Sequence, residues 1–302
     1  MSDRLALIFA GQGAQHPGMG RALYEESAAA RAVYDQADGI LGWPLRKLCF
    51  EGTEADLTAC AHCQPAIFVT SMAAVAARLS GSDGRIGDEN GSAVVCGGLS
   101  LGEWAAFTAA GALDFEAGLR AVAERGRLMD EACHRHPGGM AAVIGVDEER
   151  VAAVCAGCGA VIANYNCEGQ LIISGEKSAL EQAVASLAPE ALKCVPLEVA
   201  GAYHSPLMRE AAVAFGEYLA GVEIRKPAIP VVHNVTGAPA DNDPAAIRAR
   251  LVEQIYSPVR WDKCAGYMAG QSDRMIEVGP GHVLAGLMKR IARRFPVVSM
   301  DL

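Results

Sequence analysis

Five residues in the first half of the chain could present a nucleophile. Gly98-Leu-Ser-Leu-Gly102 fits the pattern G-x-S-x-G, with strand-like sequence at 92–96 before it and helix-like sequence at 101–110 after it. Glycines on both sides permit a tight turn that lifts the Ser100 hydroxyl above a sheet, and the N–H that follows can face an oxyanion. The alternative is a plain glycine-rich turn in which Ser100 caps a helix.

A serine nucleophile needs a general base, and His204 has the best setting among the seven histidines. Ser205 and Pro206 follow it and are typical of the N-cap and first position of a helix, which would hold the ring at a loop edge. A helix N-terminus also disfavours the protonated ring. A surface loop histidine is the alternative. No acid between Ser100 and His204 stands at an obvious strand end, so we expect a Ser–His dyad oriented by a carbonyl.

Arg125 lies on the apolar side of a predicted helix that Asp114 can cap and that runs over 115–133. At 100° per residue, Arg125 falls roughly 140° from Arg120, which belongs to the polar stripe. A buried guanidinium is costly unless it is paired. Its partner is either an internal acid, in a structural ion pair, or a substrate carboxylate held bidentately.

Strand-like and helix-like segments alternate along the chain, which predicts an α/β fold. For the outer parts, strands are expected at 5–10, 92–96, 231–234, 275–278 and 297–300. The middle follows another order, with strands at 140–145, 160–164, 171–174 and 192–197 and helices at 148–155 and 178–187. This β-α-β-β-α-β order is typical of a ferredoxin-like unit. We therefore expect a large domain of 1–136 and 204–302 with a small ferredoxin-like subdomain of 137–203 inserted in it.

Composition narrows the class of protein. The 302 residues are 51% hydrophobic and carry a formal net charge of -9, so a sizeable core can form and nucleic acid or anionic lipid is not an expected partner. The longest uncharged run, 57–77, contains His62, Gln64 and Pro65 and predicts no membrane span. The chain opens directly into strand-like sequence, and its ten cysteines are scattered, which favours a reduced, cytoplasmic enzyme.

Two further patterns carry little chemistry. The pairs Cys60/Cys63 and Cys155/Cys158 lie far apart in helix-like sequence, so we expect no metal site. The glycine-rich segment 11–18 breaks the dinucleotide pattern G-x-G-x-x-G at His16. It remains open as a loop that brings Gln12 and its backbone amide close to a ligand.

Taken together, the segments resemble the malonyl-CoA:acyl carrier protein transacylase family, which is shared with acyltransferase domains of polyketide synthases. The resemblance covers nearly the whole chain, and the order and spacing of its landmarks are specific. The landmarks are Gly11-Gln-Gly-Ala-Gln15, Gln64-Pro-Ala66, Gly98-Leu-Ser-Leu-Gly-Glu103, Arg125-Gly126, Asn164-Tyr-Asn166, Gly201-Ala-Tyr-His-Ser205, Gln254-Ile-Tyr-Ser-Pro258 and Glu277-Val-Gly-Pro-Gly281. The family fold is a hydrolase-like α/β core with a ferredoxin-like insert, in agreement with the segment order above.

The resemblance implies a role for each matching residue. Ser100 corresponds to the acylated serine, His204 to its base, and Arg125 to the arginine that binds the malonyl carboxylate. The other implied positions are Gln12 and the Leu101 backbone at the oxyanion hole, Gln254 as the carbonyl that orients the histidine, and Asn166 as a polar residue near the cleft.

The implied reaction is a ping-pong transfer of malonyl from malonyl-CoA to the phosphopantetheine thiol of acyl carrier protein. It needs no metal or other cofactor, and the family tends to be monomeric. A hydrolase that removes acyl groups from carrier proteins would share the Ser–His pair, although Arg125 argues against it, and a non-catalytic scaffold is a further alternative. An acidic carrier would need a local basic patch, for which Lys289, Arg290, Arg293 and Arg294 are candidates; a solvated helix end is the alternative.

Three positions depart from the family pattern. Leu99 stands where histidine commonly precedes the serine, Trp104 stands where tyrosine is frequent, and Tyr203 stands where phenylalanine is frequent before the histidine. We expect Leu99 to change local polarity without abolishing catalysis, because that side chain is not the base. An aromatic residue at 203 is consistent with a small acyl group such as malonyl.

Overall fold

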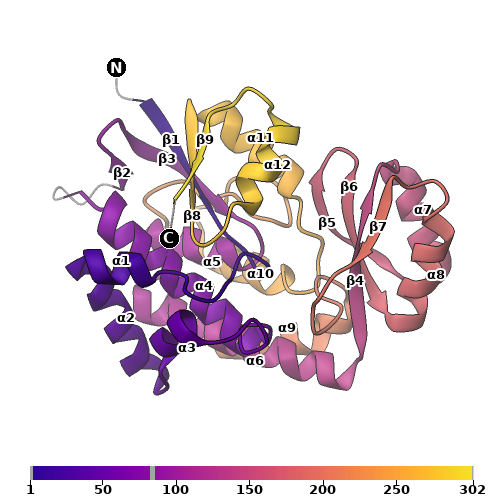
Figure 1. The fold of residues 1–302 in the computed structure, drawn as a ribbon, viewed down its shortest axis with the longest axis horizontal. Helices are drawn as coiled ribbons and strands as arrows, with labels where there is room; N and C mark the ends of the chain where they lie inside the picture. The colour runs from indigo at the N-terminus through magenta and orange to yellow at the C-terminus, as the bar shows by residue number, and fades with distance from the viewer. Residues whose placement is uncertain (1–2, 82–85, 301) are drawn as a thin grey trace.

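A computed structural model describes residues 3–81, 86–300 and 302. The described chain forms an α/β fold with two separate sheets, one mixed and one antiparallel (Figure 1). The strands are β1 Asp3–Phe9, β2 Gly87–Asp88, β3 Gly91–Gly98, β4 Gly138–Ile144, β5 Val161–Cys167, β6 Gln170–Glu176, β7 Lys193–Pro196, β8 Arg274–Val278 and β9 Val297–Ser299. The helices are α1 Arg21–Glu26, α2 Ala28–Leu41, α3 Leu45–Glu51, α4 Cys60–Ala74, α5 Leu101–Ala109, α6 Phe115–Arg135, α7 Glu148–Cys158, α8 Lys177–Leu187, α9 Arg209–Leu219, α10 Pro244–Glu253, α11 Trp261–Gln271 and α12 Val283–Ile291, with the short helices η1 Val75–Leu79 and η2 Pro206–Met208.

The mixed sheet has the strand order β2-β3-β1-β8-β9, in which β3, β1, β8 and β9 are parallel and β2 pairs antiparallel with β3. The central strand β1 is buried from Leu5 to Phe9, as expected for a parallel strand covered on both faces. Its alternate residues serve two cores: Leu5, Leu7 and Phe9 pack in one, Ala6 and Ile8 in the other. The larger core includes α2, α4, α5 and α6, and the smaller includes α11 and α12 on the opposite side of the sheet (Figure 1).

The uncharged segment at 57–77 becomes a core helix. Cys60–Leu79 is long and apolar enough to cross a membrane by length and composition alone, yet 72% of its apolar window is buried inside the protein. The hydroxyls of its polar residues Thr70 and Ser71 donate hydrogen bonds to the carbonyls of Ala66 and Ile67, each at 2.8 Å. Burial by α2, α5 and α6 therefore accounts for its apolar surface without a bilayer.

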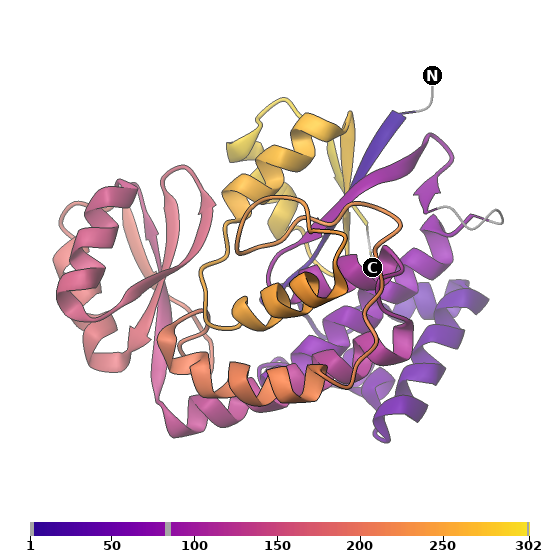
Figure 2. The same cartoon turned by 180° about the vertical axis from the view of Figure 1, so that it is seen from behind.

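The antiparallel sheet lies at one end of the molecule, as seen from both sides (Figures 1 and 2). Its order is β5-β6-β4-β7, and α7 and α8 enclose a separate core with one of its faces. The expected order of strand, helix, strand, strand, helix, strand is therefore confirmed for the middle of the chain. The other face carries Met140 and Ile172 toward the large core.

One expected strand is wrong. Residues 231–234 make only isolated bridges, of Val231 with Cys96 and of Val232 with Pro239. The chain then leaves the edge of β3 because Asn234 uses its backbone and side-chain groups on the turn around Ser100. The other expected strands are present with small differences at their ends.

Candidate active site

The turn between β3 and α5 has the strained geometry expected of a nucleophile elbow. Ser100 has φ 53° and ψ -102°, and it makes no side-chain capping bond to α5, so the simple capping turn does not describe it. Gly102 allows the elbow to form, because a Cβ there would lie 2.1 Å from the carbonyl oxygen of Phe9. The serine thus sits where β3 ends beside the central strand.

His204 lies directly against the serine. The Ser100 Oγ is 2.8 Å from His204 Nε2, and His204 Nδ1 is 2.8 Å from the backbone oxygen of Gln254. Because a carbonyl can only accept, Nδ1 carries the proton and Nε2 is left to accept from the serine hydroxyl. Ser205 caps the short helix η2 through the N–H of Leu207, and His204 itself has φ 55°. The two side chains and the Gln254 carbonyl therefore have the arrangement expected for a Ser–His pair that a carbonyl orients.

Burial keeps this histidine neutral. The pKa of His204 is lowered from 6.5 to about 4, first because burial penalises the charged ring and second because Arg125 lies nearby. The sequence predicts the same direction from a helix end, but desolvation is the largest cause. A neutral imidazole at physiological pH is the form that can take a proton from Ser100.

Arg125 is buried and has neutral partners. Its Nη1 donates to Gln64 Oε1 at 2.6 Å, and its Nη2 donates to Ser100 Oγ and to Gln254 Oε1, both at 3.1 Å. In the described part of the chain no acid forms a salt bridge with it, so the structural ion pair is not what holds this side chain. Burial lowers the pKa of Arg125 to about 10, which still leaves the guanidinium charged at neutral pH.

A pocket of about 270 Å³ opens at Ser100 and His204, between the two sheets. The loop after β1 contributes Gln12, the segment between β7 and η2 contributes Tyr203, and the antiparallel sheet contributes Asn166. The wall is mostly apolar with a few polar groups, as is usual for small-molecule sites. Arg125 is not part of this wall; its guanidinium reaches the pocket through the Ser100 hydroxyl.

The remaining expected residues lie close to the same point. Cys60 Sγ lies 3.3 Å from Gln12 Oε1 and 2.9 Å from the Tyr203 hydroxyl, so the thiol links the two residues. The Oδ1 atom of Asn166 is buried without a protein partner. Leu101 is the first residue of α5, and none of the hydrogen bonds among the described residues uses its N–H.

A second set of buried polar residues surrounds the elbow and was not predicted from the sequence. Glu103, His233 and Asn234 are all buried, and the Glu103 carboxylate accepts from both of the others; Gln64 accepts from Arg125. Glu103 and Gln64 belong to landmarks of the family resemblance, but they had been given no role. Polar residues inside apolar segments were the available signal, because such groups must find partners when buried.

No group of three or more His, Cys, Asp or Glu side chains suited to a metal ion occurs among the residues that the structure describes. Cys60 and Cys63 lie in the buried helix α4, and Cys155 and Cys158 lie in α7, within the separate core of the antiparallel sheet.

The fold agrees with the comparisons with known proteins. Residues 6–296 match the family model of the acyl transferase domain, and the chain belongs to this family. It is 37% identical over 99% of its length to the malonyl CoA-acyl carrier protein transacylase of Bacillus subtilis strain 168, of which it covers 94%. The protein of the same name from Escherichia coli K12 is 36% identical over 95% of this chain, which covers 93% of that protein.

Solved structures give the same result. An acyl carrier protein S-malonyltransferase from Vibrio cholerae superposes with a TM-score of 0.91 at 36% identity, covering 99% of this chain and 97% of that one. A malonyl-transacylase solved in complex with a type II PKS acyl-carrier protein also has a TM-score of 0.91, at 34% identity, covering 99% of this chain and 96% of that one.

Proposed function

We propose that this chain transfers a malonyl group from malonyl-CoA to the phosphopantetheine thiol of an acyl carrier protein, for fatty-acid or polyketide synthesis. The observation that carries the proposal is the position of Ser100 Oγ, which contacts both the base His204 at 2.8 Å and the buried cation Arg125 at 3.1 Å. A nucleophile next to a buried guanidinium suits an acyl group that carries its own carboxylate. The names of the relatives described above support the same activity.

In the first half-reaction, His204 Nε2 takes the proton of Ser100 as Oγ attacks the thioester carbonyl. The resulting tetrahedral oxyanion would be bound by the backbone N–H groups of Gln12, which lines the pocket, and of Leu101, which follows Ser100. Neither N–H makes a hydrogen bond among the described residues. The imidazolium then gives its proton to the leaving CoA thiolate. A malonyl-serine ester remains, and its carboxylate would pair with Arg125.

In the second half-reaction, the carrier thiol enters the vacated pocket and His204 takes its proton. The thiolate attacks the malonyl ester, the same oxyanion site stabilises the intermediate, and the proton returns from His204 to Ser100. Asn166, whose Oδ1 has no protein partner at the pocket wall, would orient the thioester or the pantetheine amides. No metal or redox group enters either step.

The carrier would approach along α12. Val283 and Leu287 of this helix line the pocket, and Lys289 and Arg290 stand in its last turn. Together with Arg293 and Arg294 they form the basic patch proposed for an acidic carrier protein.

At the level of the fold, we propose that the mixed sheet is a hydrolase-like core of 1–136 and 204–302 and that 137–203 is a ferredoxin-like subdomain. The order β5-β6-β4-β7 with α7 and α8 on one face supports the second assignment. We also propose a monomeric, cytoplasmic enzyme.

Intact-mass measurements test the function. The protein is incubated with malonyl-CoA and then with a carrier protein bearing its phosphopantetheine arm. We expect a malonyl adduct on Ser100 that moves to the carrier and is missing in Ser100→Ala. Rapid release of free malonate would instead identify a hydrolase, and no adduct at all would exclude both enzymes.

A further inference from the structure

A buried carboxylate next to the site has no role in the reaction described above. Glu103 lies in the first turn of α5, three residues after the nucleophile, and it is fully buried. Its Oε1 accepts from His233 Nδ1 at 2.6 Å, and its Oε2 accepts from Gln254 Nε2 at 2.6 Å and from the Asn234 N–H at 3.2 Å. A buried carboxylate with this many donors is held in one orientation.

Gln254 links this carboxylate to the base and to the cation. Its backbone oxygen holds His204 Nδ1 at 2.8 Å, and its side-chain Oε1 accepts from Arg125 Nη2 at 3.1 Å. The orientation of the amide is fixed by chemistry, because a flipped amide would set NH₂ against the guanidinium and oxygen against the carboxylate of Glu103. The same Nε2 donates to the backbone oxygen of Ser100 at 2.8 Å.

Asn234 holds the other side of the serine. Its Oδ1 accepts from the Ser100 N–H at 2.6 Å, and its Nδ2 donates to the carbonyl of Gly98 at 2.8 Å. The strained elbow is therefore tied at both peptide groups of Ser100, and both ties lead to Glu103. Strained backbone of this kind persists only where surrounding contacts fix it.

We propose that Glu103 is a positioning residue for the acyl transfer: through Gln254 and Asn234, its carboxylate fixes the elbow of Ser100 and the ring of His204 relative to each other. This inference rests on the proposed function, because it concerns the same reaction. Glu103 also opposes the charge of Arg125 at a distance, with the Gln254 amide between them. The guanidinium therefore keeps neutral contacts and remains available to a substrate carboxylate.

Loss of the Glu103 carboxylate should lower the rate of acyl transfer and leave the binding of malonyl-CoA unchanged. Without the carboxylate, the Ser–His geometry loosens, so the rate of the chemical step falls for every acyl group. Arg125 keeps Gln64 and loses an opposing charge, so binding of malonyl-CoA is not weakened. The loss thus belongs to kcat and not to KM.

The test compares Glu103→Gln with the wild type in single-turnover acylation of Ser100 by malonyl-CoA and by acetyl-CoA, per folded enzyme. We expect the maximal rate to fall about tenfold or more for both substrates, while the half-saturating malonyl-CoA concentration changes by less than about threefold. Glu116→Gln is the matched control, since it removes an exposed carboxylate that pairs with Arg120 on α6. A maximal rate within about twofold of wild type, or a loss confined to half-saturation, would overturn the proposal.

Glu103→Asp covers the case in which Glu103→Gln does not fold. It keeps the charge on a shorter stem, so we expect a rate below that of the wild type and above that of Glu103→Gln where both fold. A rate for Glu103→Asp equal to that of the wild type, or a rate for Glu103→Gln above that of Glu103→Asp, contradicts a role for a positioned carboxylate. The wild type distinguishes the two hypotheses: if it forms no malonyl-serine, the proposed function itself fails.

Discussion

At the scale of single residues, the site places two groups of different character around one oxygen atom. Ser100 Oγ contacts a neutral histidine and a charged arginine, and all three residues are buried. Burial acts on each in its own way. It lowers the pKa of His204, so the ring stays unprotonated and can act as a base. It also strengthens the interaction of Arg125 with any carboxylate that reaches it.

Arg125→Ala should separate acyl groups with and without a carboxylate. Loss of a buried charged partner costs about 2 to 4 kcal/mol, so kcat/KM for malonyl-CoA should fall roughly 30- to 1,000-fold more than that for acetyl-CoA. Steady-state transfer to carrier protein measures both, with Arg120→Ala as the control, because Arg120 is exposed on the same helix and pairs with Glu116. Equal losses for the two substrates would contradict the carboxylate contact.

The pH dependence of acylation should report His204. Its lowered pKa means that the neutral base persists from neutral pH down to about pH 4, and that activity is lost only as the pH falls through that value. Quenched-flow measurement of the acylation rate with acetyl-CoA gives this pH profile, because the acetyl group carries no carboxylate that titrates. An acid limb centred near 6.5, the ordinary value for histidine, would show that burial does not control this group.

At the scale of elements, the nucleophile depends on close contact of α5 with β3 and with the central strand β1. Gly98 and Gly102 permit these contacts, since a Cβ at Gly98 would lie 2.1 Å from the backbone of Gly102 and a Cβ at Gly102 would lie 2.1 Å from the Phe9 carbonyl oxygen. The same contact directs the N-terminus of α5 toward the pocket. The packing of α5 on the strands therefore sets the conformation of the turn that carries Ser100.

Gly102→Ala should destabilise the protein and impair acylation together. The added Cβ would lie 2.1 Å from the Phe9 carbonyl oxygen, so α5 must shift, at a cost of about 1 to 3 kcal/mol. Urea denaturation measures the free energy of unfolding. Gly266→Ala in α11 is the control, because no atom beyond its own helix backbone and chain neighbours lies within 4 Å of its added Cβ, and a gain of about 0.5 to 1 kcal/mol is expected there.

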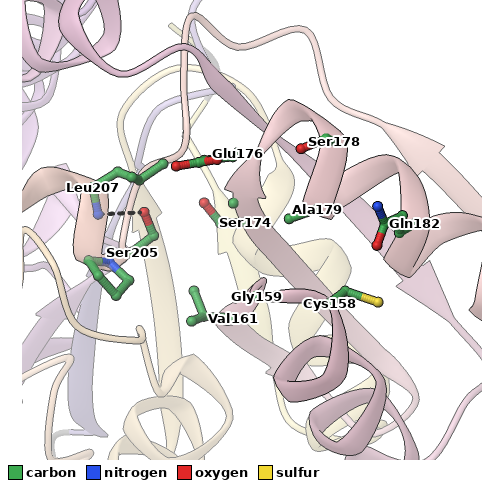
Figure 3. Close-up of a pocket in the computed structure, with 12 residues that line it drawn as sticks. Cys158, Gly159, Val161, Ser174, Glu176, Ser178, Ala179, Gln182, Ser205 and Leu207 are labelled. Atoms are coloured by element: carbon green, nitrogen blue, oxygen red, sulfur yellow. Dashed lines mark hydrogen bonds between the residues drawn. The ribbon is translucent and has the colours of Figure 1, made fainter.

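At the scale of the whole molecule, the pocket lies between two sheets, so their junction matters for catalysis. The chain runs from β7 toward η2 and α9 through Gly201, three residues before His204. Beside this crossing is a cavity of about 360 Å³, where Val161 and Ser174 of the antiparallel sheet face Ser205 and Leu207 (Figure 3). The segment that carries the base is thus packed tightly on the α6 side and loosely on the sheet side.

Gly201→Ala tests this junction. Its Cβ would lie 2.3 Å from Cys133 Sγ on α6, which should displace the segment leading to His204 and reduce acylation several-fold at a cost of about 1 to 3 kcal/mol in stability. Gly157→Ala in α7 offers open space and serves as the control in the same acylation and unfolding assays. Full activity in folded Gly201→Ala would show that the crossing does not position the base.

The sequence by itself determined the parts of the protein that depend on local pattern. Strand and helix periodicity predicted an α/β fold and the middle β-α-β-β-α-β order, and the glycines around Ser100 predicted the elbow. Arg125 stood out because helical spacing put a charge on an apolar face. These inferences use contacts within a few residues or one helical period, which a sequence displays directly.

Only the tertiary structure decided how the elbow is held. Glu103, Asn234 and Gln254 are separated by as many as 151 residues, yet their hydrogen bonds meet around Ser100. The same long-range bonds turned the expected strand at 231–234 into a loop, because Asn234 bonds to Ser100, Gly98 and Glu103 instead of continuing along β3. Buried polar groups must find partners wherever the fold brings them, and sequence spacing does not reveal which ones meet.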